Sequence, residues 1–401
     1  MTHDPAVIIV GAGPVGLGLA FRLGTFGVPT LVLEAEAAIA DQLRASTFHP
    51  PTLDMLDAYG LGAELVAQGR ITPTWQIRLH ETGERAAFDL NVLSRDTAHP
   101  YRLQAEQHKL SQLFLDRLAA LDMVSVRFRQ PVVAVGQDDA GAWVDVAPTS
   151  GGNERHRAGF VVGCDGARSA VRKAIGQPLK GQTYPETTVL ATTPTPFEDK
   201  LTALSGVNYI WMGHGTYSLL RLPTLWRCSF HPKPDQSPEQ AATPGAVQDA
   251  ISEILDEPPP FDVHEVRPYR VHARIVDDYR QGRIILAGDA AHLNSPKGGM
   301  GMNGGLHDAW NLSDKLRQII HDGGSHDLLD LYTRQRRPIA AEEIIAQADQ
   351  NRKRMNETDP DKRRAHLAQL RATAADPEKA RAFLLRSSMI TGLKRSEALA
   401  A

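Results

Sequence analysis

The sequence predicts an α/β protein that is built on a parallel sheet and interrupted by an antiparallel one. Three stretches support the parallel part: residues 6–16, 160–166 and 284–289 each hold a short apolar run that ends in a glycine-rich or acidic turn. A short, continuous apolar run is typical of a strand buried on both faces, as in parallel sheets. Alternating and aromatic residues between 184 and 232 indicate the antiparallel part.

Composition and charge describe a globular protein with more than one folded unit. The chain has 401 residues, of which 42% are hydrophobic and 23% charged, so it exceeds one ordinary core. A net charge of −3, without a sustained basic block before the C-terminal tail, argues against nucleic acid as a partner. No apolar run reaches 18 residues, so we expect no membrane partner either.

The cysteines bear on the compartment and on metal binding. Cys164 and Cys228 are too few for a disulfide framework, and neither belongs to a metal-ligand spacing. The N-terminus passes from Met1 through THDP directly into an apolar run, which leaves no room for a signal peptide. We therefore expect a cytoplasmic protein without a metal site.

The first stretch carries a dinucleotide-binding fingerprint in its required context. An apolar strand at 6–10 enters GAGPVG, a helix follows, and a second strand then ends at Glu34. Gly11 allows the tight turn, Gly13 lets the backbone approach a pyrophosphate, and Gly16 lets the helix pack closely on the strand. Glu34 can accept hydrogen bonds from the ribose of an adenosine, which favours an adenosine without a 2′-phosphate.

The second and third stretches place two further carboxylates at strand ends. Asp165 follows the strand at 160–162, and Asp289 follows the strand at 284–287. Because the carboxyl ends of parallel strands meet at one edge of a sheet, we expect both to lie beside the fingerprint loop. Asp289 would then be placed to bind a polyol.

A GxGxxG hexapeptide at 299–304 resembles a second fingerprint, but no strand precedes it, so the dinucleotide interpretation fails. It lies in the loop 296–305 and opens a helix expected to begin near Met302. A helix N-terminus carries about half a positive charge. The glycines would let backbone N–H groups approach a flat ring, and a reduced isoalloxazine ring is anionic. The loop is therefore predicted to lie over the ring end of a flavin.

The rest of the chain supplies further elements. We expect strands at 75–79, 85–90, 124–128, 143–146, 160–162 and 266–275, a sheet across 184–232, and helices from Pro50, at 102–118, 247–255, 328–337 and 340–355, and after 361. The aromatic load of the sheet suits a mostly apolar pocket wall. The predicted division is a nucleotide-binding domain in three parts (1–72, 99–180 and 271–345), substrate-domain strands at 73–98, a substrate-binding sheet domain at 181–270 and C-terminal helices at 346–401.

Taken together, GAGPVG with Glu34, GCDGARSAVR at 163–172 and GRIILAGDAAHLNSPKGGMGMNGGLHDAWNL at 282–312 resemble the class A flavoprotein monooxygenases of the para-hydroxybenzoate hydroxylase type. The similarity covers residues 6 to about 340, with three motifs in the same order. Within that group the chain looks closest to the single-component phenol hydroxylases, including the para-nitrophenol monooxygenase type. The extra thioredoxin-like domain of the larger phenol hydroxylases is not seen before Ala401.

The resemblance implies a Rossmann-like FAD-binding fold with an inserted antiparallel β-sheet substrate domain. It also implies a reaction in which NADH or NADPH, bound transiently, reduces FAD, and O2 then forms a flavin C4a-hydroperoxide that hydroxylates a phenolic or hydroxylated heteroaromatic ring. The protein would supply placement and water exclusion, while the flavin supplies the oxygen chemistry. The expected partners are a small aromatic substrate and O2, and the expected assembly is a monomer or homodimer.

The resemblance and the strand-end argument together give a set of candidate residues. Those expected at the FAD are Gly11, Gly13, Pro14, Val15, Gly16, Glu34, Ala35, Arg44, Gln107, Asp165, Gly166, Gly288, Asp289, Pro296, Gly299, Gly301, Met302 and Asn303. Catalytic candidates are Arg44, for contact with the nicotinamide donor, the Pro296 carbonyl, and His214 and Tyr217 as base or proton relay; His49, His231, His272 and Tyr209 are further relay candidates. Substrate-binding candidates are Tyr209, Trp211, Tyr217, Arg221 and Pro296, with Arg221 able to pair with a ring carboxylate.

Two alternatives remain open on the sequence. A related flavin halogenase, epoxidase or prenyl reductase would use the same fold, although the five tryptophans form no WxWxIP signature and residues 356–401 are charged rather than apolar. A flavin-binding regulatory protein without turnover is the other alternative, and the intact glycines and acidic motif residues argue against it.

Overall fold

The computed structural model describes residues 4–42, 44–148, 151–213, 215–233 and 235–399. The half that carries the predicted nucleotide-binding fingerprint, called the nucleotide-binding half below, is a six-stranded sheet of order β18-β19-β12-β1-β2-β8. The strands are β1 (Val7–Val10), β2 (Thr30–Leu33), β8 (Val124–Arg127), β12 (Phe160–Gly163), β18 (Arg280–Gln281) and β19 (Ile284–Leu286). β1, β2, β8, β12 and β19 are parallel, and only the edge strand β18 is antiparallel. The apolar runs of the sequence are therefore the buried parallel strands that they predict.

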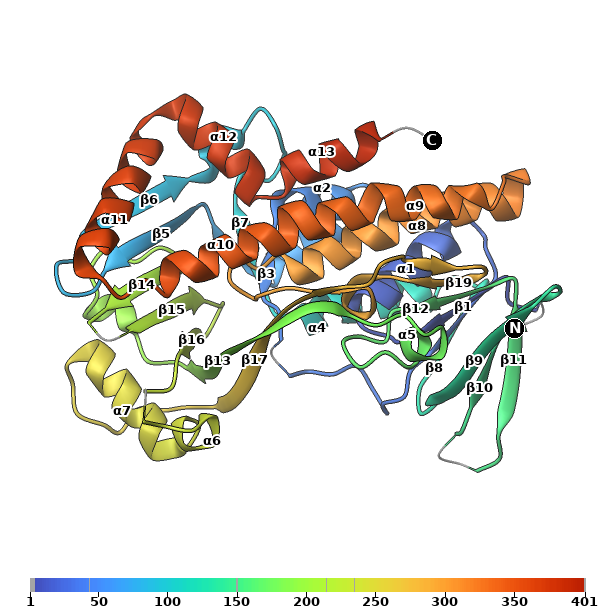
Figure 1. The fold of residues 1–401 in the computed structure, drawn as a ribbon, viewed down its shortest axis with the longest axis horizontal. Helices are drawn as coiled ribbons and strands as arrows, with labels where there is room; N and C mark the ends of the chain where they lie inside the picture. Colours follow the sequence, from blue (N-terminus) through green and yellow to red (C-terminus); the bar gives the residue numbers. More distant parts are fainter. Residues whose placement is uncertain (1–3, 43, 149–150, 214, 234, 400–401) are drawn as a thin grey trace.

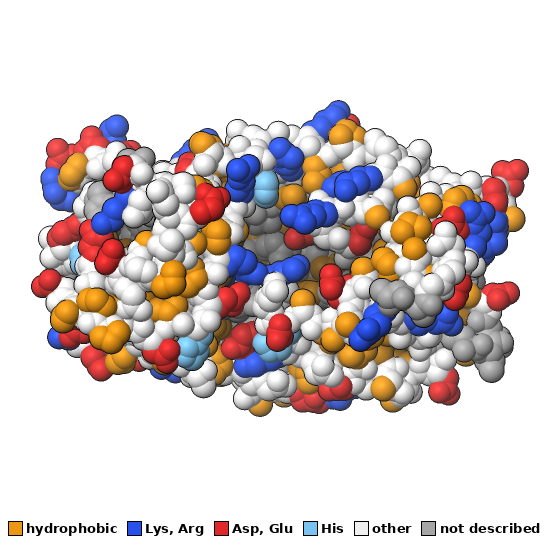
Figure 2. Space-filling view, turned by 90° about the horizontal axis from the view of Figure 1, so that it is seen from below, with side chains coloured by type: hydrophobic (Ala, Val, Ile, Leu, Met, Phe, Trp, Pro, Cys, Tyr) orange, Lys and Arg blue, Asp and Glu red, His pale blue; other side chains and the backbone are white. Residues whose placement is uncertain are grey.

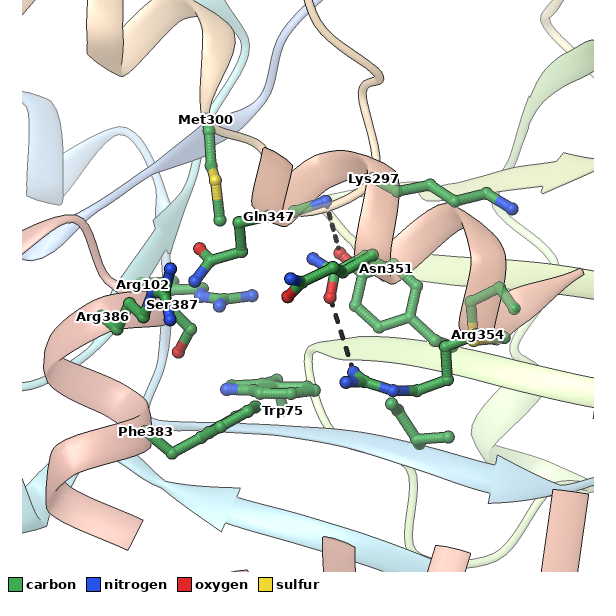
Figure 3. Close-up of a pocket in the computed structure, with 15 residues that line it drawn as sticks. Trp75, Arg102, Lys297, Met300, Gln347, Asn351, Arg354, Phe383, Arg386 and Ser387 are labelled. Carbon is green, nitrogen blue, oxygen red and sulfur yellow. Dashed lines mark hydrogen bonds between the residues drawn. The ribbon is translucent and has the colours of Figure 1, made fainter. Parts of the chain in front are cut away.

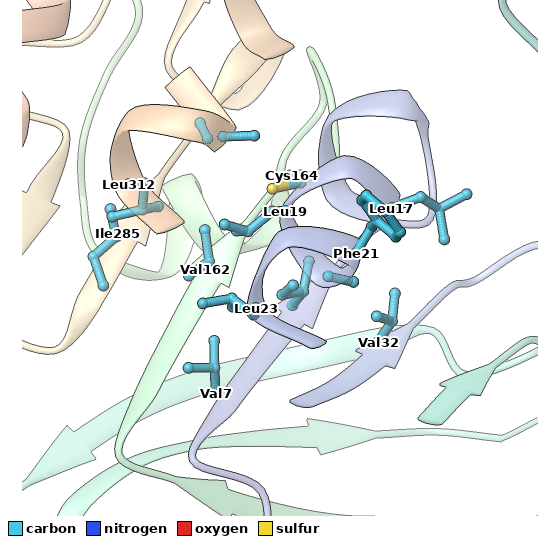
Figure 4. Packing of buried hydrophobic residues seen from close by; sticks show 14 of the residues in the cluster. Val7, Leu17, Leu19, Phe21, Leu23, Val32, Val162, Cys164, Ile285 and Leu312 are labelled. Carbon is cyan, nitrogen blue, oxygen red and sulfur yellow. The ribbon is translucent and has the colours of Figure 1, made fainter. Parts of the chain in front are cut away.

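Helix α1 (Pro14–Thr25) packs on this sheet, and Figure 4 shows its leucines between β1, β12 and β2. Leu17, Leu19 and Leu23 have no exposed surface, so the helix face and the strands form one apolar core. Helix α8 (Gly301–Asp322) crosses α1 and contributes Leu312 to the same core. The two helices whose N-termini matter for the site are thus fixed on one packed layer.

A mixed eight-stranded sheet forms the other half, in the order β20-β17-β13-β16-β15-β14-β5-β6 (Figure 1). Its strands are β5 (Thr74–Leu79), β6 (Arg85–Asp89), β13 (Lys180–Thr193), β14 (Val207–Met212), β15 (Gly215–Arg221), β16 (Trp226–Phe230), β17 (Glu265–Ile275) and β20 (His292–Leu293). The strands at 74–89 join those at 180–230, but β5 pairs with β14 in parallel rather than antiparallel register. Helices α6 (Pro238–Ala241) and α7 (Pro244–Leu255) cover one face.

Two small sheets complete the strands. One is β11-β10-β9, formed by β9 (Val132–Asp138), β10 (Gly141–Val146) and β11 (Glu154–Ala158). The other is β3-β7-β4, formed by β3 (Thr47–Phe48), β4 (Arg70–Thr72) and β7 (Arg102–Gln104). The predicted helix at 102–118 is therefore wrong at its start, because β7 pairs with both neighbours and α4 begins only at Gln107.

The remaining helices are α2 (Pro50–Asp57), α3 (Leu61–Ala67), α4 (Gln107–Leu118), α5 (Ala170–Ala174), α9 (Asp327–Ile339), α10 (Ala346–Met355), α11 (Pro360–Ala375), α12 (Pro377–Ser387) and α13 (Ile390–Ala398), with short 3-10 turns η1 (Leu90–Leu93), η2 (Phe197–Asp199) and η3 (Gly288–Ala290) and a π-helical segment η4 (Ala340–Ile345). In Figure 1, α8 and α9 run side by side, and α10 to α12 wrap the end of the sheet at β5 and β6. Among the described residues, no helix has both the length and the apolar character that crossing a membrane requires.

Candidate active site

The carboxyl ends of β1, β12 and β19 meet at one edge of the parallel sheet, as the sequence predicts. They open into a cavity of about 1130 Å³, called the main cavity here. Its walls are the glycine loop after β1, the loops at 164–168 and 287–302, and a face of the eight-stranded sheet. In the space-filling view from below, this side of the molecule is hollowed near its middle, with Lys and Arg side chains around the hollow (Figure 2).

The glycine loop has the conformation that a bound phosphate needs. Gly11 has a φ of +104°, and a Cβ there would lie 2.6 Å from the carbonyl oxygen of Cys164. At Gly13 a Cβ would meet nothing within 4 Å, so the backbone faces open space. At Gly16 a Cβ would lie 2.0 Å from the Gly11 carbonyl oxygen, which fixes the close approach of helix and loop. Gly13 thus borders the cavity, and Gly16 packs behind it.

Two helices begin at the main cavity without a side-chain cap. Neither Gly13 before α1 nor Met300 before α8 provides a capping side chain, although Thr243 caps α7 and Asp359 caps α11. The first N–H groups of a helix have no partner inside the helix, so an uncapped N-terminus attracts negative charge. α8 begins at Gly301, one residue before the expected start, and both uncapped ends suit an anionic cofactor.

Glu34 and Asp165 line the main cavity and also hold its loops. Glu34 accepts from the Ala12 amide at 2.7 Å through Oε2 and from the Glu36 amide at 2.9 Å through Oε1. Asp165 accepts from Ser169 Oγ at 2.5 Å and from the Ala170 amide at 2.6 Å. Burial raises the pKa of Asp165, and these hydrogen bonds oppose the shift. Both carboxylates therefore fix the strand ends while they face the cavity.

Asp289 is differently placed, because its side chain is exposed and makes no hydrogen bond to a described residue. Its exposed surface opens into the main cavity, where surrounding protein raises the pKa of its carboxyl; His292 and Arg44 oppose that shift. Arg44 also lines the cavity. A carboxylate that is free at the bottom of a cavity can accept hydrogen bonds from a polyol, which is the role predicted for it.

A buried network holds the third loop to α8. Asp308 accepts from His292 Nε2 at 2.8 Å, from Arg336 Nε at 2.7 Å and from the Gly288 amide at 3.2 Å. None of the three side chains has more than 1% exposure. Burial would raise the pKa of Asp308, but Arg336 and His292 outweigh it and lower the pKa to about 2. His292 and Asp308 of the motif are thus structural partners rather than cavity groups.

The loop 294–300 contacts the eight-stranded sheet through polar groups. The Gly298 amide donates to the Tyr209 hydroxyl at 3.1 Å, and the Pro296 carbonyl accepts from the Gly299 amide at 3.0 Å. Lys297 Nζ lies 3.3 Å from His231 Nε2 and 3.3 Å from Asn356 Oδ1. Burial lowers the pKa of Lys297 to about 8, with Glu186 opposing and Arg352 assisting.

His231 is a neutral acceptor in this arrangement. Its Nδ1 lies 3.0 Å from the Thr187 carbonyl, so Nδ1 carries the proton and Nε2 accepts from Lys297. Burial, aided by the charge of Lys297, lowers the pKa of His231 to about 4. The sequence gives no sign that these two residues, 66 positions apart, form a pair.

Most of the predicted cofactor residues line the main cavity. They are Gly11, Gly13, Pro14, Val15, Glu34, Ala35, Arg44, Gln107, Asp165, Gly166, Asp289, Pro296, Gly299, Gly301 and Met302. Gly16, Gly288 and Asn303 are not among the lining residues. A Cβ on Gly288 would lie 3.1 Å from Val15, so this glycine serves packing. Asn303 bonds the His49 amide at 2.9 Å and the Thr47 carbonyl at 2.8 Å, and it is a strut with no exposed surface.

The substrate candidates divide between the two faces of the eight-stranded sheet. Tyr209 faces the main cavity. Trp211, fully buried, donates to the Arg354 carbonyl at 3.2 Å under the C-terminal helices instead. Tyr217 borders the cavity, but its ring packs toward α7 and its hydroxyl lies 2.7 Å from His80 Nδ1; burial raises its pKa.

Two further candidates are Arg221, predicted to bind the substrate, and His214, predicted to act in catalysis. Arg221 lies over the Trp226 ring, with 5.3 Å from Cζ to the centroid, and its Nη2 is 3.6 Å from Glu198. It is not among the described residues that line the cavity, and it pairs with Glu198 instead of pointing a charge at a substrate there. His214 lies outside the described residues.

Residues that the sequence interpretation missed occupy alternate positions on the cavity face. Thr188 and Leu190 of β13, Arg227 and Ser229 of β16, and Ser218 and Leu220 of β15 line the main cavity. The opposite residues, such as Cys228 and Leu219, enter the core under α7. Strand alternation predicts two faces, but it does not say which face meets the nucleotide-binding half.

The residues present fit FAD. The cavity has room for a dinucleotide, two uncapped helix N-termini border it, and the free Asp289 carboxylate opens into it. Fifteen of the residues predicted from the motifs converge there, although they come from segments far apart in the chain.

Known proteins share this arrangement. A family model described as an FAD binding domain matches residues 4–347. The para-nitrophenol 4-monooxygenase of Pseudomonas sp. (strain WBC-3) is 34% identical over 392 residues, which cover 96% of each chain. The 6-hydroxy-3-succinoylpyridine 3-monooxygenase HspB of Pseudomonas putida (strain DSM 28022 / S16) is 36% identical over 353 residues, covering 88% of this chain and 89% of that protein.

A solved structure is similar over nearly the whole chain. The crystal structure of the p-nitrophenol 4-monooxygenase PnpA from Pseudomonas putida DLL-E4 superimposes with a TM-score of 0.91 at 33% identity. The match covers 97% of this chain and 98% of that one. The similarity therefore includes the eight-stranded sheet and the C-terminal helices as well as the nucleotide-binding half.

Proposed function

The chain belongs to the FAD-binding family of aromatic monooxygenases, and we propose that it hydroxylates a phenolic or hydroxylated heteroaromatic ring with O2 and NADH or NADPH. It is an FAD-dependent aromatic hydroxylase, which sets aside the halogenase, epoxidase and prenyl reductase alternatives and the non-enzymatic one. The aromatic class, the electron donor and its action as a single-component enzyme are the proposal.

One observation supports the proposal: the main cavity is lined both by the predicted dinucleotide-binding loops and by the face of the eight-stranded sheet that is predicted to bind the aromatic substrate. At one end lie the glycine loop, Glu34 and the N-terminus of α1; at the other lie the N-terminus of α8 and the sheet face with Tyr209. FAD, when bound there, supplies the activation of O2 and the transfer of an oxygen atom to the ring. The residues of the chain bind, orient and exclude water.

The cofactor would be held by the groups already described. The N–H groups at the start of α1 would bind the pyrophosphate, and Glu34 would bind the adenosine ribose. Asp289 would hold the ribityl hydroxyls. The N-terminus of α8 supplies positive potential without a titrating group, so it stabilises negative charge at the ring at any pH.

On the substrate side, Lys297, His231 and Tyr209 form the polar set. A phenol reacts faster with an electrophilic oxygen when its hydroxyl loses its proton. Lys297 is charged at neutral pH and favours a phenolate beside it, while neutral His231 accepts from Lys297 at Nε2 and orients the ammonium group. The Pro296 carbonyl has a second lone pair available for a substrate hydroxyl.

Arg44 is proposed to help the nicotinamide donor meet the flavin. It is exposed, lines the main cavity and lies within electrostatic reach of Asp289. A transient site is proposed because the GxGxxG at 299–304 opens α8 instead of following a strand. Both cysteines are free thiols, which supports the proposed cytoplasmic compartment, and the proposed assembly is a monomer or homodimer.

The proposal is tested by screening phenols and hydroxypyridines for stimulated NAD(P)H oxidation, with product analysis for each hit. We expect at least one compound to be hydroxylated with consumption coupled to product. Arg44→Ala should keep its FAD but be reduced more slowly by NAD(P)H. Oxidation that yields only H2O2 with every compound would refute the hydroxylase proposal, and unchanged reduction kinetics would refute the role of Arg44.

A further inference from the structure

A second, smaller cavity adjoins the main one and has no place in the proposal so far. It has a volume of about 170 Å³ and shares Tyr209, Lys297, Met300 and Met355 with the main cavity. We call it the side cavity. Its other walls come from β5, β7, α10 and α12, as Figure 3 shows. None of the described residues that line it is acidic, whereas three are arginines.

Arg102 is the most buried of these arginines. It comes from β7, is 3% exposed, and its Cζ lies 5.1 Å from the centroid of the Trp75 ring. Its side chain is hydrogen-bonded to the neutral Tyr209, but its Nε has no hydrogen-bond partner, and it forms no ion pair within the described part of the chain. A guanidinium stays protonated even here, so a positive charge is buried without a counter-ion.

Arg354 brings a second positive charge to the same cavity. It lies on α10, and its Nη1 is 3.5 Å from Asn351 Oδ1, which is a weak contact to a neutral group. No carboxylate pairs with it among the residues described, and burial lowers its pKa. In contrast, Arg386 at the same cavity donates to Glu343 at 3.1 Å, so its charge is already compensated. Arg102 and Arg354 are the uncompensated pair.

One wall of the side cavity is flat and aromatic, and Arg102 lies against it. Trp75 stacks on Phe88 with centroids 4.7 Å apart and on Phe383 with centroids 6.0 Å apart. Elsewhere in the side cavity, Gln347 Oε1 and Ser387 Oγ are buried without a hydrogen-bond partner. A buried polar atom without a partner costs about 1–3 kcal/mol. A site that keeps two cations without a carboxylate and buries unpartnered polar atoms is suited to a ligand rather than to stability.

The size and place of the side cavity limit that ligand. A volume of 170 Å³ holds roughly five water-sized groups, enough for a carboxylate on a short chain but not for the flavin. Two of the residues shared with the main cavity, Tyr209 and Lys297, are those proposed to hold the phenolic ring. One molecule can therefore reach both cavities.

We propose that the side cavity binds an acidic arm of the aromatic substrate, a carboxylate held by Arg102 and Arg354 beside the Trp75 ring. Two guanidinium groups match the paired oxygens of a carboxylate, and the low-dielectric wall strengthens the interaction. This inference rests on the proposed function and narrows the substrate to phenols that carry a carboxylate. It assigns to β7 and α10 the carboxylate recognition that the sequence suggested for Arg221.

The test compares acids with their methyl esters on the FAD-loaded enzyme. 4-Hydroxybenzoate and 3-(4-hydroxyphenyl)propanoate and their esters are titrated by calorimetry, and each is assayed for stimulated NAD(P)H oxidation. At least one acid should bind about 10-fold more tightly than its ester. Arg354→Gln should remove that preference while the affinity for the ester changes by less than about 2-fold.

Lys353→Gln is the matched control, because it removes the same charge from the neighbouring position of α10, where the side chain is 69% exposed. It should leave the preference intact. Arg102→Gln provides a second variant from a different element. Equal affinities for every acid and ester, or a preference that survives both arginine variants, would overturn the inference. Arginine-dependent binding of an acid without hydroxylation of any phenol would overturn the proposed function and keep the site.

Discussion

Arg336 and Arg102 are both buried guanidinium groups, with exposed fractions of 0% and 3%, but their surroundings are opposite. Arg336 donates to Asp308 at 2.7 Å, and its other nitrogens reach Ser396 Oγ at 3.4 Å and the Gly304 carbonyl at 3.3 Å. Arg102 has the Trp75 ring beside it and an Nε without a partner in the described chain. The charge of Arg336 is neutralised by a carboxylate inside the protein, whereas Arg102 has no carboxylate partner and lines the side cavity.

The difference shows how burial can be separated from function. A buried charge that is fully paired ties elements together, as Asp308 ties η3, α8 and α9, and removing one partner leaves the other exposed to a low dielectric. A buried charge without a counter-ion does not increase the free energy of unfolding, and it can bind an anionic ligand. The two classes should therefore respond in opposite ways to substitution.

The largest effect is expected for Asp308→Asn. The change leaves Arg336 buried without a carboxylate and should lower the free energy of unfolding by about 3–5 kcal/mol. Urea denaturation of the apoprotein measures it. Asp322→Asn is the control on the same helix, because Asp322 and its partner Arg317 are 55% and 35% exposed, so the change should cost less than about 1 kcal/mol. Equal losses of unfolding free energy in the two variants would mean that the buried ion pair of Asp308 with Arg336 does not stabilise the protein more than an exposed pair does.

Asp308 also predicts a pH limit. Its folded pKa of about 2 lies below the ordinary value of 3.8, so its contribution to stability is present above pH 4 and is lost as the pH falls toward 2. The parent and Asp308→Asn should converge in stability over that acid range. A difference between them that stays constant down to pH 2 would contradict the lowered pKa.

Asp289→Asn should separate cofactor binding from stability. The carboxylate is open to the main cavity, and its raised pKa means that the fold does not favour its charge. The urea midpoint of the apoprotein should hardly change, whereas affinity for FAD should fall roughly 10- to 100-fold, since a hydrogen bond to a charged group contributes about 1.5–3 kcal/mol. FAD titration by fluorescence quenching measures the affinity. A yellow variant with parental affinity would remove the ribityl role.

The same contrast explains what the sequence could predict. The glycine loop, Asp165 and Asp289 were found because each is a local pattern of strand, turn and helix, and parallel strands bring their ends together. Arg102 and Arg354 were missed because strand pairing between 47–48, 70–72 and 102–104 placed one, and helix packing after α9 placed the other. Periodicity had assigned Arg102 to a helix, and tertiary pairing overrode that preference.

The faces of the eight-stranded sheet show the same limit. Alternation puts Tyr209 and Trp211 on one face and Tyr217 on the other, because Tyr217 pairs with Ile210. Only the packing of α7 on one side and the C-terminal helices over part of the other decides that Tyr209 meets the cavity while Trp211 is covered. Aromatic content therefore predicted a pocket wall without predicting which rings form it.

A smaller effect is expected from Lys297. Its folded pKa of about 8 lies below the ordinary 10.5, so the unfolded chain binds the extra proton between these values and stability rises with pH there. From pH 7 to 9 this lysine should contribute a gain of about 1 kcal/mol that Lys297→Met lacks. Urea unfolding of both proteins at the two pH values measures it. A parallel pH response would contradict the burial of this ammonium group.

The smallest effect, and the sharpest test of the comparison, is expected for Arg102→Met. Methionine keeps the volume against Trp75 and removes an uncompensated charge, so the free energy of unfolding should stay within about 1 kcal/mol of the parent or rise. Arg336→Met makes the same chemical change in the closed network and should cost about 3–5 kcal/mol, because Asp308 then remains buried without its guanidinium partner. Matched denaturation curves measure both. A loss of unfolding free energy at Arg102 as large as that at Arg336 would show that Arg102 stabilises the folded protein. That result would contradict the proposal that the side cavity is an anion-binding site.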